Sequence, residues 1–563
     1  MIRAITTFHL ILIKPTHYDA DGYPIQWLRN WIASNSLACL NALALDCRDR
    51  KVLGPEVKIE VHAMDEICQR VPTKKLLNRV KRDGGRALVC LVGVQSNQFP
   101  RALDIARQFL AVGLPVIAGG IHVSGCIAML KELPPDLREA QSLGISFFAG
   151  EAEEGRLERV IKDVYAGRLQ PLYNFLANPP GLKGEPVPIL PRETLTRSGY
   201  LTLSIFDMGR GCPFRCSFCT IINVHGRKSR FRSPDDLERI ILENDRMGIH
   251  QFFITDDNLA RNANWEPLFD RLIELREVRG IPLRLIVQVD TMAHRIPGFI
   301  DKAVRAGVDQ MFIGLESVNP ENLAGAGKSQ NNISEYREMM LAWKRHPVVI
   351  TGAYILGFSG DTPESIRHDV EFIKRELPVD TVYFTILTPL PGSEDHKRLW
   401  EQGVWMDPDM NKYDTTNPVM EHPRMTAKEL RQAYLDAWER FYTFEHMETV
   451  FRRMFALGSN KKLTTANRLA MYSYFYRYMG THPIDGGMHP VRRRRDRRPT
   501  LPRENPFAFY PKNLVRTAVH HITSRIHLSR VRRMMRRIRR DKTKAAYRDA
   551  AIASAFEQHL SGQ

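Results

Sequence analysis

Three closely spaced cysteines constrain this chain more than any other feature. Cys212, Cys216 and Cys219 stand in one short loop that follows an apolar run at 201–206. Glycines at 209 and 211 allow a tight turn before them. Thiolates hold iron–sulfur clusters, which usually have four such ligands. Three thiolates therefore predict a [4Fe-4S] cluster with one iron open to another ligand.

A zinc ion or three unrelated core cysteines are the alternatives to the cluster. A zinc site normally closes with a fourth Cys or His, and His225 is the only nearby candidate. The chain has eight cysteines in 563 residues, too few for a disulfide framework. We expect reduced thiols and a cytoplasmic protein. The five remaining cysteines are scattered: Cys39, Cys47, Cys68, Cys90 and Cys126.

Residues 1–177 are predicted to form a doubly wound parallel sheet of the Rossmann type. Short apolar runs alternate with segments of helical periodicity, and 87–94 is continuously apolar, as buried parallel strands are. Ligands bind such sheets at the carboxyl ends of the strands. The expected strands are 8–13, 57–61, 87–94, 114–118 and 145–149.

A linker and a second α/β region are expected next. Residues 178–196 are rich in proline and glycine, which indicates a linker. Residues 197–406 then give six strand–helix units, a partial (β/α)6 barrel whose function would lie at the carboxyl ends of its strands. Those strands are expected at 201–206, 251–255, 283–289, 311–315, 348–356 and 381–387.

The cysteine loop and the barrel together resemble the radical S-adenosylmethionine (SAM) superfamily. In that family the open iron binds SAM, and the reduced cluster cleaves it to methionine and a 5′-deoxyadenosyl radical. The resemblance implies SAM-binding roles for polar or aromatic residues in the cysteine loop and at strand ends. These are Phe218, Asp256, Asp257, Asn258, Glu316, Ser317 and Gly357. The family's usual Gly-Gly-Glu is missing at 256–258, where two acids and an amide stand instead.

The first region resembles the cobalamin-binding domain that precedes many radical SAM domains. Small residues and a histidine end one predicted strand, and glycine and glutamate follow the next. The axial-ligand motif Asp-x-His-x-x-Gly of classical cobalamin domains is absent, and many radical SAM relatives also lack it. The resemblance implies cobalamin contacts at Gly119, Gly120, His122, Gly150 and Glu151.

The C-terminal part is predicted to be helical at 407–488, with a basic tail at 489–563. The net charge of the chain is +18, and residues 490–563 contribute +15 of it. We expect disorder around 492–498, where arginines and prolines gather. Apolar residues recur among arginines at 514–538, as in a basic amphipathic helix. Such a helix could lie on anionic lipid, bind nucleic acid, or cover the protein's own surface.

The implied function is a radical SAM enzyme that functionalises an unactivated carbon, with cobalamin-dependent methyl transfer as the commonest outcome in relatives. A cyclase or oxidoreductase without cobalamin is one alternative, and a methylthiotransferase acting on tRNA is another. A zinc-stabilised nucleic-acid-binding protein is the alternative from a different class. The expected partners are a small-molecule substrate, for which the tail suggests a lipid- or isoprenoid-derived compound, and an external electron donor of the flavodoxin or ferredoxin type. The tail would also let a cytoplasmic enzyme touch the inner face of the membrane.

Overall fold

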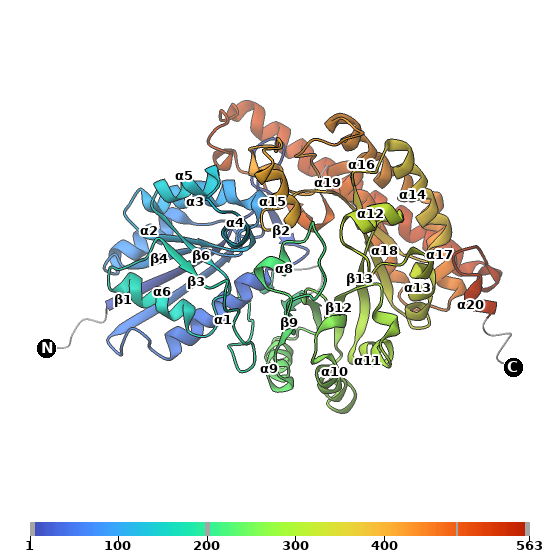
Figure 1. The fold of residues 1–563 in the computed structure, drawn as a ribbon, viewed down its shortest axis with the longest axis horizontal. Helices are drawn as coiled ribbons and strands as arrows, with labels where there is room; N and C mark the ends of the chain where they lie inside the picture. Colours follow the sequence, from blue (N-terminus) through green and yellow to red (C-terminus); the bar gives the residue numbers. More distant parts are fainter. Residues whose placement is uncertain (1–5, 198–202, 480–481, 558–563) are drawn as a thin grey trace.

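Two parallel sheets with covering helices form the body of the protein in the computed structural model, which describes residues 6–197, 203–479 and 482–557 (Figure 1). The first sheet occupies the blue-to-cyan half of Figure 1 and the second sheet the green-to-orange half. Both predicted α/β units are confirmed. None of the described helices has the length and the hydrophobicity needed to cross a bilayer.

The first sheet has six parallel strands in the order β3-β1-β4-β5-β6-β7. The chain adds β3 on one side of β1 and then β4 on the other side. The gap between the ends of β1 and β4 is therefore the switch point where such sheets bind ligands. The short strand β7 was not expected from the sequence. The strands are β1 (Thr6–Lys14), β3 (Val57–Asp65), β4 (Ala87–Leu91), β5 (Val116–Gly119), β6 (Ile145–Ala149) and β7 (Leu172–Asn174).

Helices cover both faces of this sheet because its central strands are apolar on both sides. In β1, Leu10 and Leu12 pack with one set of helices, and Ile11 and Ile13 pack with the other. This explains the unbroken apolar run in β1 and β4. One face carries α1 (Asn35–Asp49) and α6 (Arg156–Tyr165), and the other carries α2 (Thr73–Arg82) and α3 (Phe99–Leu110).

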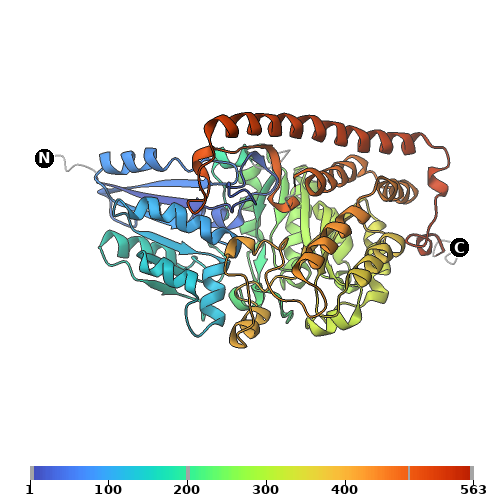
Figure 2. The same ribbon diagram turned by 90° about the horizontal axis from the view of Figure 1, so that it is seen from above.

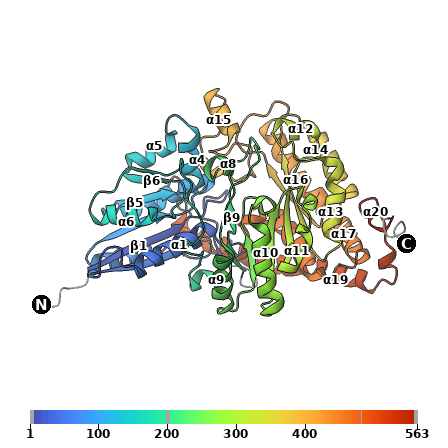
Figure 3. The ribbon, with the colours of Figure 1, turned by 60° about the horizontal axis from the view of Figure 1, so that its bottom comes forward.

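The second sheet has six parallel strands in chain order, which is the predicted partial barrel. Helices α9, α10, α11, α13 and α14 lie outside it (Figure 3). Leu201 and Thr202 of the first predicted strand lie outside the described residues. The strands are β8 (Leu203–Phe206), β11 (Gln251–Ile254), β12 (Arg284–Val289), β13 (Val308–Glu316), β14 (Val349–Leu356) and β15 (Thr381–Ile386).

Local capping signals set the starts of several helices in the second half. Ser233 caps α9 (Pro234–Asp245), and Thr362 caps α14 (Pro363–Glu376). Thr426 and Glu429 form the predicted capping box at α16 (Ala427–Phe441). The outer helices of the barrel also include α10 (Trp265–Ile273), α11 (Phe299–Ala306) and α13 (Tyr336–Lys344).

The long helix α19 (Pro506–Arg540) in the C-terminal region runs along one side of the molecule (Figure 2). It contacts α17 (Phe444–Ala456) and α18 (Lys462–Tyr474). The buried side chains Val531, Met535 and Ile538 belong to the main hydrophobic core. The predicted amphipathic segment 514–538 lies inside this helix.

The expectation of disorder at 492–498 is wrong. Strand β16 (Gly487–Pro490) pairs with β2 (Trp27–Asn30) near the start of the chain. Arg492 then forms ion pairs with Asp19 and Asp21, and Arg498 donates to Asp409. Because the cations are matched by carboxylates far away in sequence, the segment is held in place despite its composition.

Candidate active site

The cysteine loop begins at the carboxyl end of β8. The chain first forms a short antiparallel pair between β9 (Gly209–Arg210) and β10 (Arg230–Phe231). Gly211 then adopts a φ of +97°, and a Cβ on it would lie 2.4 Å from the carbonyl oxygen of Lys228. Only glycine fits this turn without displacing backbone. Cys212, Cys216 and Cys219 follow, before the short helix α8 (Ile221–Val224).

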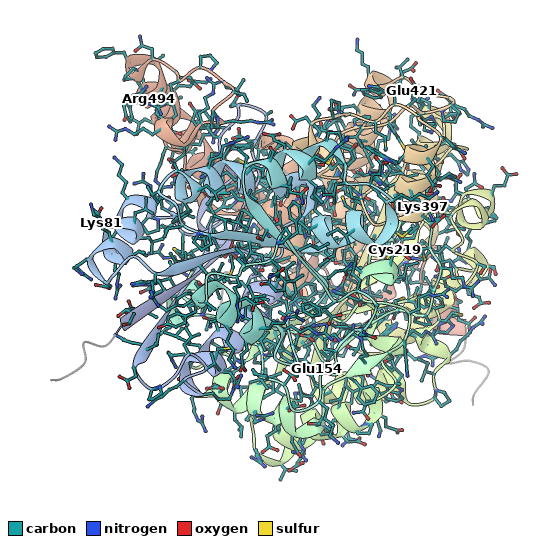
Figure 4. All side chains as sticks on the ribbon, turned by 60° about the vertical axis from the view of Figure 1, so that its left-hand side comes forward. Lys81, Glu154, Cys219, Lys397, Glu421 and Arg494 are labelled. Carbon is teal, nitrogen blue, oxygen red and sulfur yellow. The ribbon has the colours of Figure 1, made fainter. Side chains whose placement is uncertain are left out.

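The three thiols are not arranged as ligands of a single zinc ion. Cys216 is buried, and Cys212 and Cys219 are partly exposed. Among the described residues, the three sulfur atoms do not all lie within 4.8 Å of one another, as ligands of one zinc ion would. Gln330 donates to Cys216 Sγ at 3.7 Å. Figure 4 shows Cys219 inside the outline of the molecule, unlike Lys81 and Arg494 at the periphery.

Two aspartates at the end of β11 support this loop. Asp256 accepts hydrogen bonds from the backbone N–H of Met208 (2.6 Å) and from the Asn262 amide (2.9 Å). Burial raises the pKa of Asp256 to about 7. Asp257 accepts from the N–H of Gly211 at 2.7 Å and contacts His225. Both acids therefore hold the cysteine loop, and His225 is already engaged by a carboxylate.

Unpartnered polar atoms lie next to these acids. Asn258 donates to Asp290 at 2.9 Å, but its Oδ1 is buried without a hydrogen-bond partner. The hydroxyl of Thr255 is buried and unpartnered in the same way. Buried polar groups normally find partners. A ligand with hydrogen-bond donors, such as the amino group of SAM, would fit this edge of the sheet.

A buried ion pair stands at the end of β13. Glu316 has a φ of +63°, a strained value for a residue other than glycine, and it pairs with Lys328. Lys328 Nζ lies 5.7 Å from the centre of the Phe218 ring. Burial alone would lower the pKa of Lys328, but Glu316 and then Cys216 reverse this effect and raise it. The ammonium group thus lies where it acts on both the carboxylate and the cluster loop.

Ser317 and Gly357 use their polar groups in local hydrogen bonds. The Ser317 hydroxyl accepts from the N–H of Asn319 at 3.0 Å. Gly357 has a φ of +92°, and its N–H donates to Asp361 at 2.8 Å. Both residues therefore shape the turns after β13 and β14. Their predicted contact with SAM stays a prediction.

The corresponding edge of the first sheet is built from glycine backbone. Gly119 ends β5, Gly120 starts α4 (Ile121–Met129), and Gly150 follows β6. A Cβ on Gly120 would lie 2.1 Å from the backbone nitrogen of Val94. A cavity of about 170 Å³ lies here, and Arg210 also borders it. The cavity can hold a ring-sized part of a large cofactor against bare backbone, which fits the cobalamin expectation.

His122 is a buried member of a hydrogen-bonded network. Its Nδ1 lies 3.1 Å from Ser96 Oγ, and its Nε2 lies 2.8 Å from Asp136 Oδ2. Both ring nitrogens are therefore occupied, and the imidazole is fully buried. In this conformation the side chain holds α4 against the sheet and offers no free nitrogen to a ligand.

Glu151 connects the two sheets. Its carboxylate pairs with Arg210 of the cysteine segment and accepts from Arg230 Nη1 at 2.9 Å. Burial opposes ionisation of Glu151, but Arg210 and Arg230 outweigh it and lower the pKa to about 2. Arg210 also pairs with Glu153 and Asp207. The carboxylate predicted to contact cobalamin therefore fastens the glycine edge to the cysteine loop.

Sequence reasoning missed Lys328, Arg210 and Arg230. Each makes its important contact with a residue distant in sequence or on another element: Glu316 for Lys328, and Glu151 for the two arginines. Arg210 carried one available signal, since it stands between the two glycines of the cysteine loop. No local pattern marks Lys328.

The fold and the site together define a radical SAM enzyme. Residues 207–373 match the family described as the radical SAM superfamily. The match starts just before the cysteine loop and ends within α14, so it covers the loop, the acids after β11 and the Glu316–Lys328 pair.

Relatives with known names point in the same direction. The chain is 26% identical over 348 residues to bacteriochlorophyllide d C-12(1)-methyltransferase from Chlorobaculum tepidum, covering 61% of this chain and 72% of the relative. It is 27% identical over 330 residues to the hopanoid C-2 methylase of Rhodopseudomonas palustris, covering 58% and 59% respectively.

A solved structure shows the same fold over most of the chain. The radical SAM methyltransferase TsrM from Kitasatospora setae, determined with cobalamin and a [4Fe-4S] cluster bound, aligns with a TM-score of 0.54 at 17% identity. The alignment covers 77% of this chain and 89% of TsrM. TsrM thus holds two of the three cofactors that the sequence predicts for this chain.

Proposed function

We propose that this chain is a cobalamin-dependent radical SAM methyltransferase acting on a small molecule. One observation carries the proposal: Glu151, beside the glycine edge of the first sheet, pairs with Arg210 in the cysteine segment of the second. This contact brings the two predicted cofactor edges to one interface. The names of the bacteriochlorophyllide and hopanoid relatives support methyl transfer.

The residues of the site have separate tasks in this proposal. When bound, the cluster, SAM and cobalamin supply the radical and the methyl group. Cys212, Cys216 and Cys219 hold the cluster, and Lys328 pairs with Glu316 beside it. The glycines at 119 and 120 let the turn after β5 pack closely against Phe148 and Val94, which shapes the cavity beside them.

The test is cofactor content after anaerobic production with hydroxocobalamin supplied. We expect iron, sulfide and one cobalamin per chain in the wild type. Gly120→Ala should retain the cluster and lose cobalamin, because its Cβ meets Val94. Gly144→Ala is the matched control, since Gly144 also has a positive φ but nothing within 4 Å of its Cβ position. Equal cobalamin in both variants would contradict the proposal.

A wild type with a cluster and no cobalamin would favour the second candidate, a radical SAM cyclase or oxidoreductase. In either case we propose an external one-electron donor of the flavodoxin or ferredoxin type. Residues 490–563 contribute +15 of the net charge of +18, and this basic segment would attract an acidic partner. Reduction of the cluster by such a donor should then slow as salt is added.

We also propose that this cytoplasmic enzyme touches an anionic membrane through α19 and takes a lipid- or isoprenoid-derived substrate. The first half of α19 exposes apolar side chains that recur every three or four residues, and basic side chains follow. A helix with such a face lies in the interface of a bilayer. The exposed apolar residues are Phe507, Tyr510, Leu514, Val515, Val519, Ile522 and Ile526.

Cosedimentation with vesicles tests this contact. The wild type should sediment with anionic vesicles and less with neutral ones. Ile522→Asp should weaken binding, whereas Val278→Asp, which changes an exposed apolar residue of the barrel, should not. Equal binding of both variants would remove the membrane proposal and leave the methyltransferase proposal intact.

A further inference from the structure

A second group of potential metal ligands lies far along the chain from the cysteine loop. His9 is on β1, and Glu60 and His62 are on the neighbouring edge strand β3. His9 pairs in register with Glu60, and Ile11 pairs with His62. Because side chains alternate along strands, all three point to the same face of the sheet. Among the described residues this is the one group of three His, Cys, Asp or Glu residues whose ligand atoms all lie within 4.8 Å.

The distances within the group match those of a tetrahedral metal site. His9 Nδ1 lies 3.0 Å from His62 Nε2 and 3.4 Å from Glu60 Oε2. His62 Nε2 lies 3.9 Å from Glu60 Oε2. Ligand atoms about 2.0–2.1 Å from a zinc ion in a tetrahedron are about 3.3 Å from one another. The three atoms are therefore placed around a common point at nearly this spacing.

The other atoms of these side chains are oriented as in the outer shell of a metal site. Glu60 Oε1 accepts from Arg79 at 2.6 Å, which leaves Oε2 facing the imidazoles. His9 Nε2 lies 3.3 Å from Asp83 Oδ2, although no hydrogen bond of normal geometry forms between them. Metal-bound histidines usually turn their second nitrogen toward a carboxylate in this way.

The three ligands differ in exposure, and the His9 imidazole is fully buried. His62 and Glu60 remain partly exposed, which leaves a path for the ion.

We propose that His9, Glu60 and His62 bind one divalent transition metal ion, with zinc as the ion favoured by two imidazoles and a carboxylate. Water completes the coordination. The ion ties the edge strand β3 to β1 under α2. The site is independent of the cluster and of the proposed methyl transfer.

The experiment measures zinc in cluster-reconstituted protein after chelator treatment, addition of Zn²⁺ and gel filtration. We expect one zinc per chain, and a higher melting temperature with Zn²⁺ than without it. His62→Gln and Glu60→Gln should lose both effects. His250→Gln is the matched control, because His250 also faces a carboxylate, Asp245, at 2.8 Å. Asp83→Asn should weaken zinc affinity by about tenfold to a hundredfold.

Two results would overturn the proposal. One is a wild type that retains no zinc and shows no zinc-dependent change in melting temperature. The other is equal zinc in the wild type and in His62→Gln, which would assign the ion to the cysteines. Melting without zinc checks that His62→Gln is folded. The first result does not bear on cobalamin or cluster content, and iron and sulfide measured in the same samples show whether zinc has replaced the cluster in the second.

Discussion

The two sheets present opposite kinds of edge to their shared interface. The edge of the second sheet is rich in side chains: three thiols, buried acids and the Glu316–Lys328 pair. The edge of the first sheet has glycines at 119, 120 and 150 among the residues that line its cavity. We expect the second sheet to bind its cofactors through side chains, and the first sheet to bind through the cavity beside its glycines. Removing a side chain should therefore impair the edge of the second sheet, and adding a side chain should impair the glycine edge of the first sheet.

Removing one cysteine gives the largest expected effect. Cys216→Ala takes away one of three cluster thiolates, so iron and sulfide should fall to background and SAM cleavage should be lost. Cobalamin content should stay unchanged, because no glycine of the first sheet is altered. Iron and sulfide analysis checks the loss of the cluster, and cobalamin absorbance checks that cobalamin content is unchanged. Loss of both cofactors together would show that the edges are not independent.

Removing Lys328 should cost both stability and SAM binding. Lys328→Met leaves Glu316 buried without its partner, a loss of about 3–5 kcal/mol in the free energy of unfolding. Lys344→Met is the matched control, since Lys344 forms a similar buried pair with Asp380 elsewhere in the barrel. Both variants should melt earlier. Only Lys328→Met should weaken SAM binding and alter the EPR signal of the reduced cluster.

The ion pair between Glu151 and Arg210 predicts that the free energy of unfolding depends on pH. The pKa of Glu151 is about 2 in the folded protein, below its ordinary value of 4.5. A carboxylate with a lowered pKa stabilises the fold above pH 4.5, and this stability is lost as the pH falls toward 2. The contribution is about 3 kcal/mol. Denaturant unfolding of cluster-free protein should show a smaller loss between pH 7 and pH 3 for Glu151→Gln than for the wild type.

The smallest expected effect is on the reduction potential of the cluster. Gln330→Ala removes the side-chain hydrogen bond to Cys216 Sγ. Hydrogen bonds to cluster sulfurs help to set the potential, and a lost donor shifts it to more negative values. A redox titration followed by EPR measures the shift. An unchanged potential would show that this 3.7 Å contact has no influence on the cluster.

Much of the fold could be predicted because it depends on local patterns. Apolar runs marked most strands, and Ser233, Thr362 and Thr426 marked helix starts. The cysteines could be predicted because three ligands lie within eight residues. Strand β7 was missed since it has only three residues, and two of them are exposed.

The rest could not be predicted because it depends on partners far apart in the chain. Lys328 resembles any other lysine until β13 places Glu316 beside it. The arginines at 492–498 resemble a disordered segment until Asp19, Asp21 and Asp409 neutralise them. His122 is predicted to contact cobalamin, yet Ser96 and Asp136 engage both of its ring nitrogens in a buried network.

The pairing of the chain's two ends has a consequence for synthesis. Asp19 and Arg492 are 473 residues apart. At about 5–20 residues per second, a ribosome needs roughly half a minute to a minute and a half to make that stretch. A cavity of about 700 Å³ walled by both ends, with His17 on one side and Arg516 on the other, does not exist before then. The segment from Arg492 to Arg516 completes this chamber.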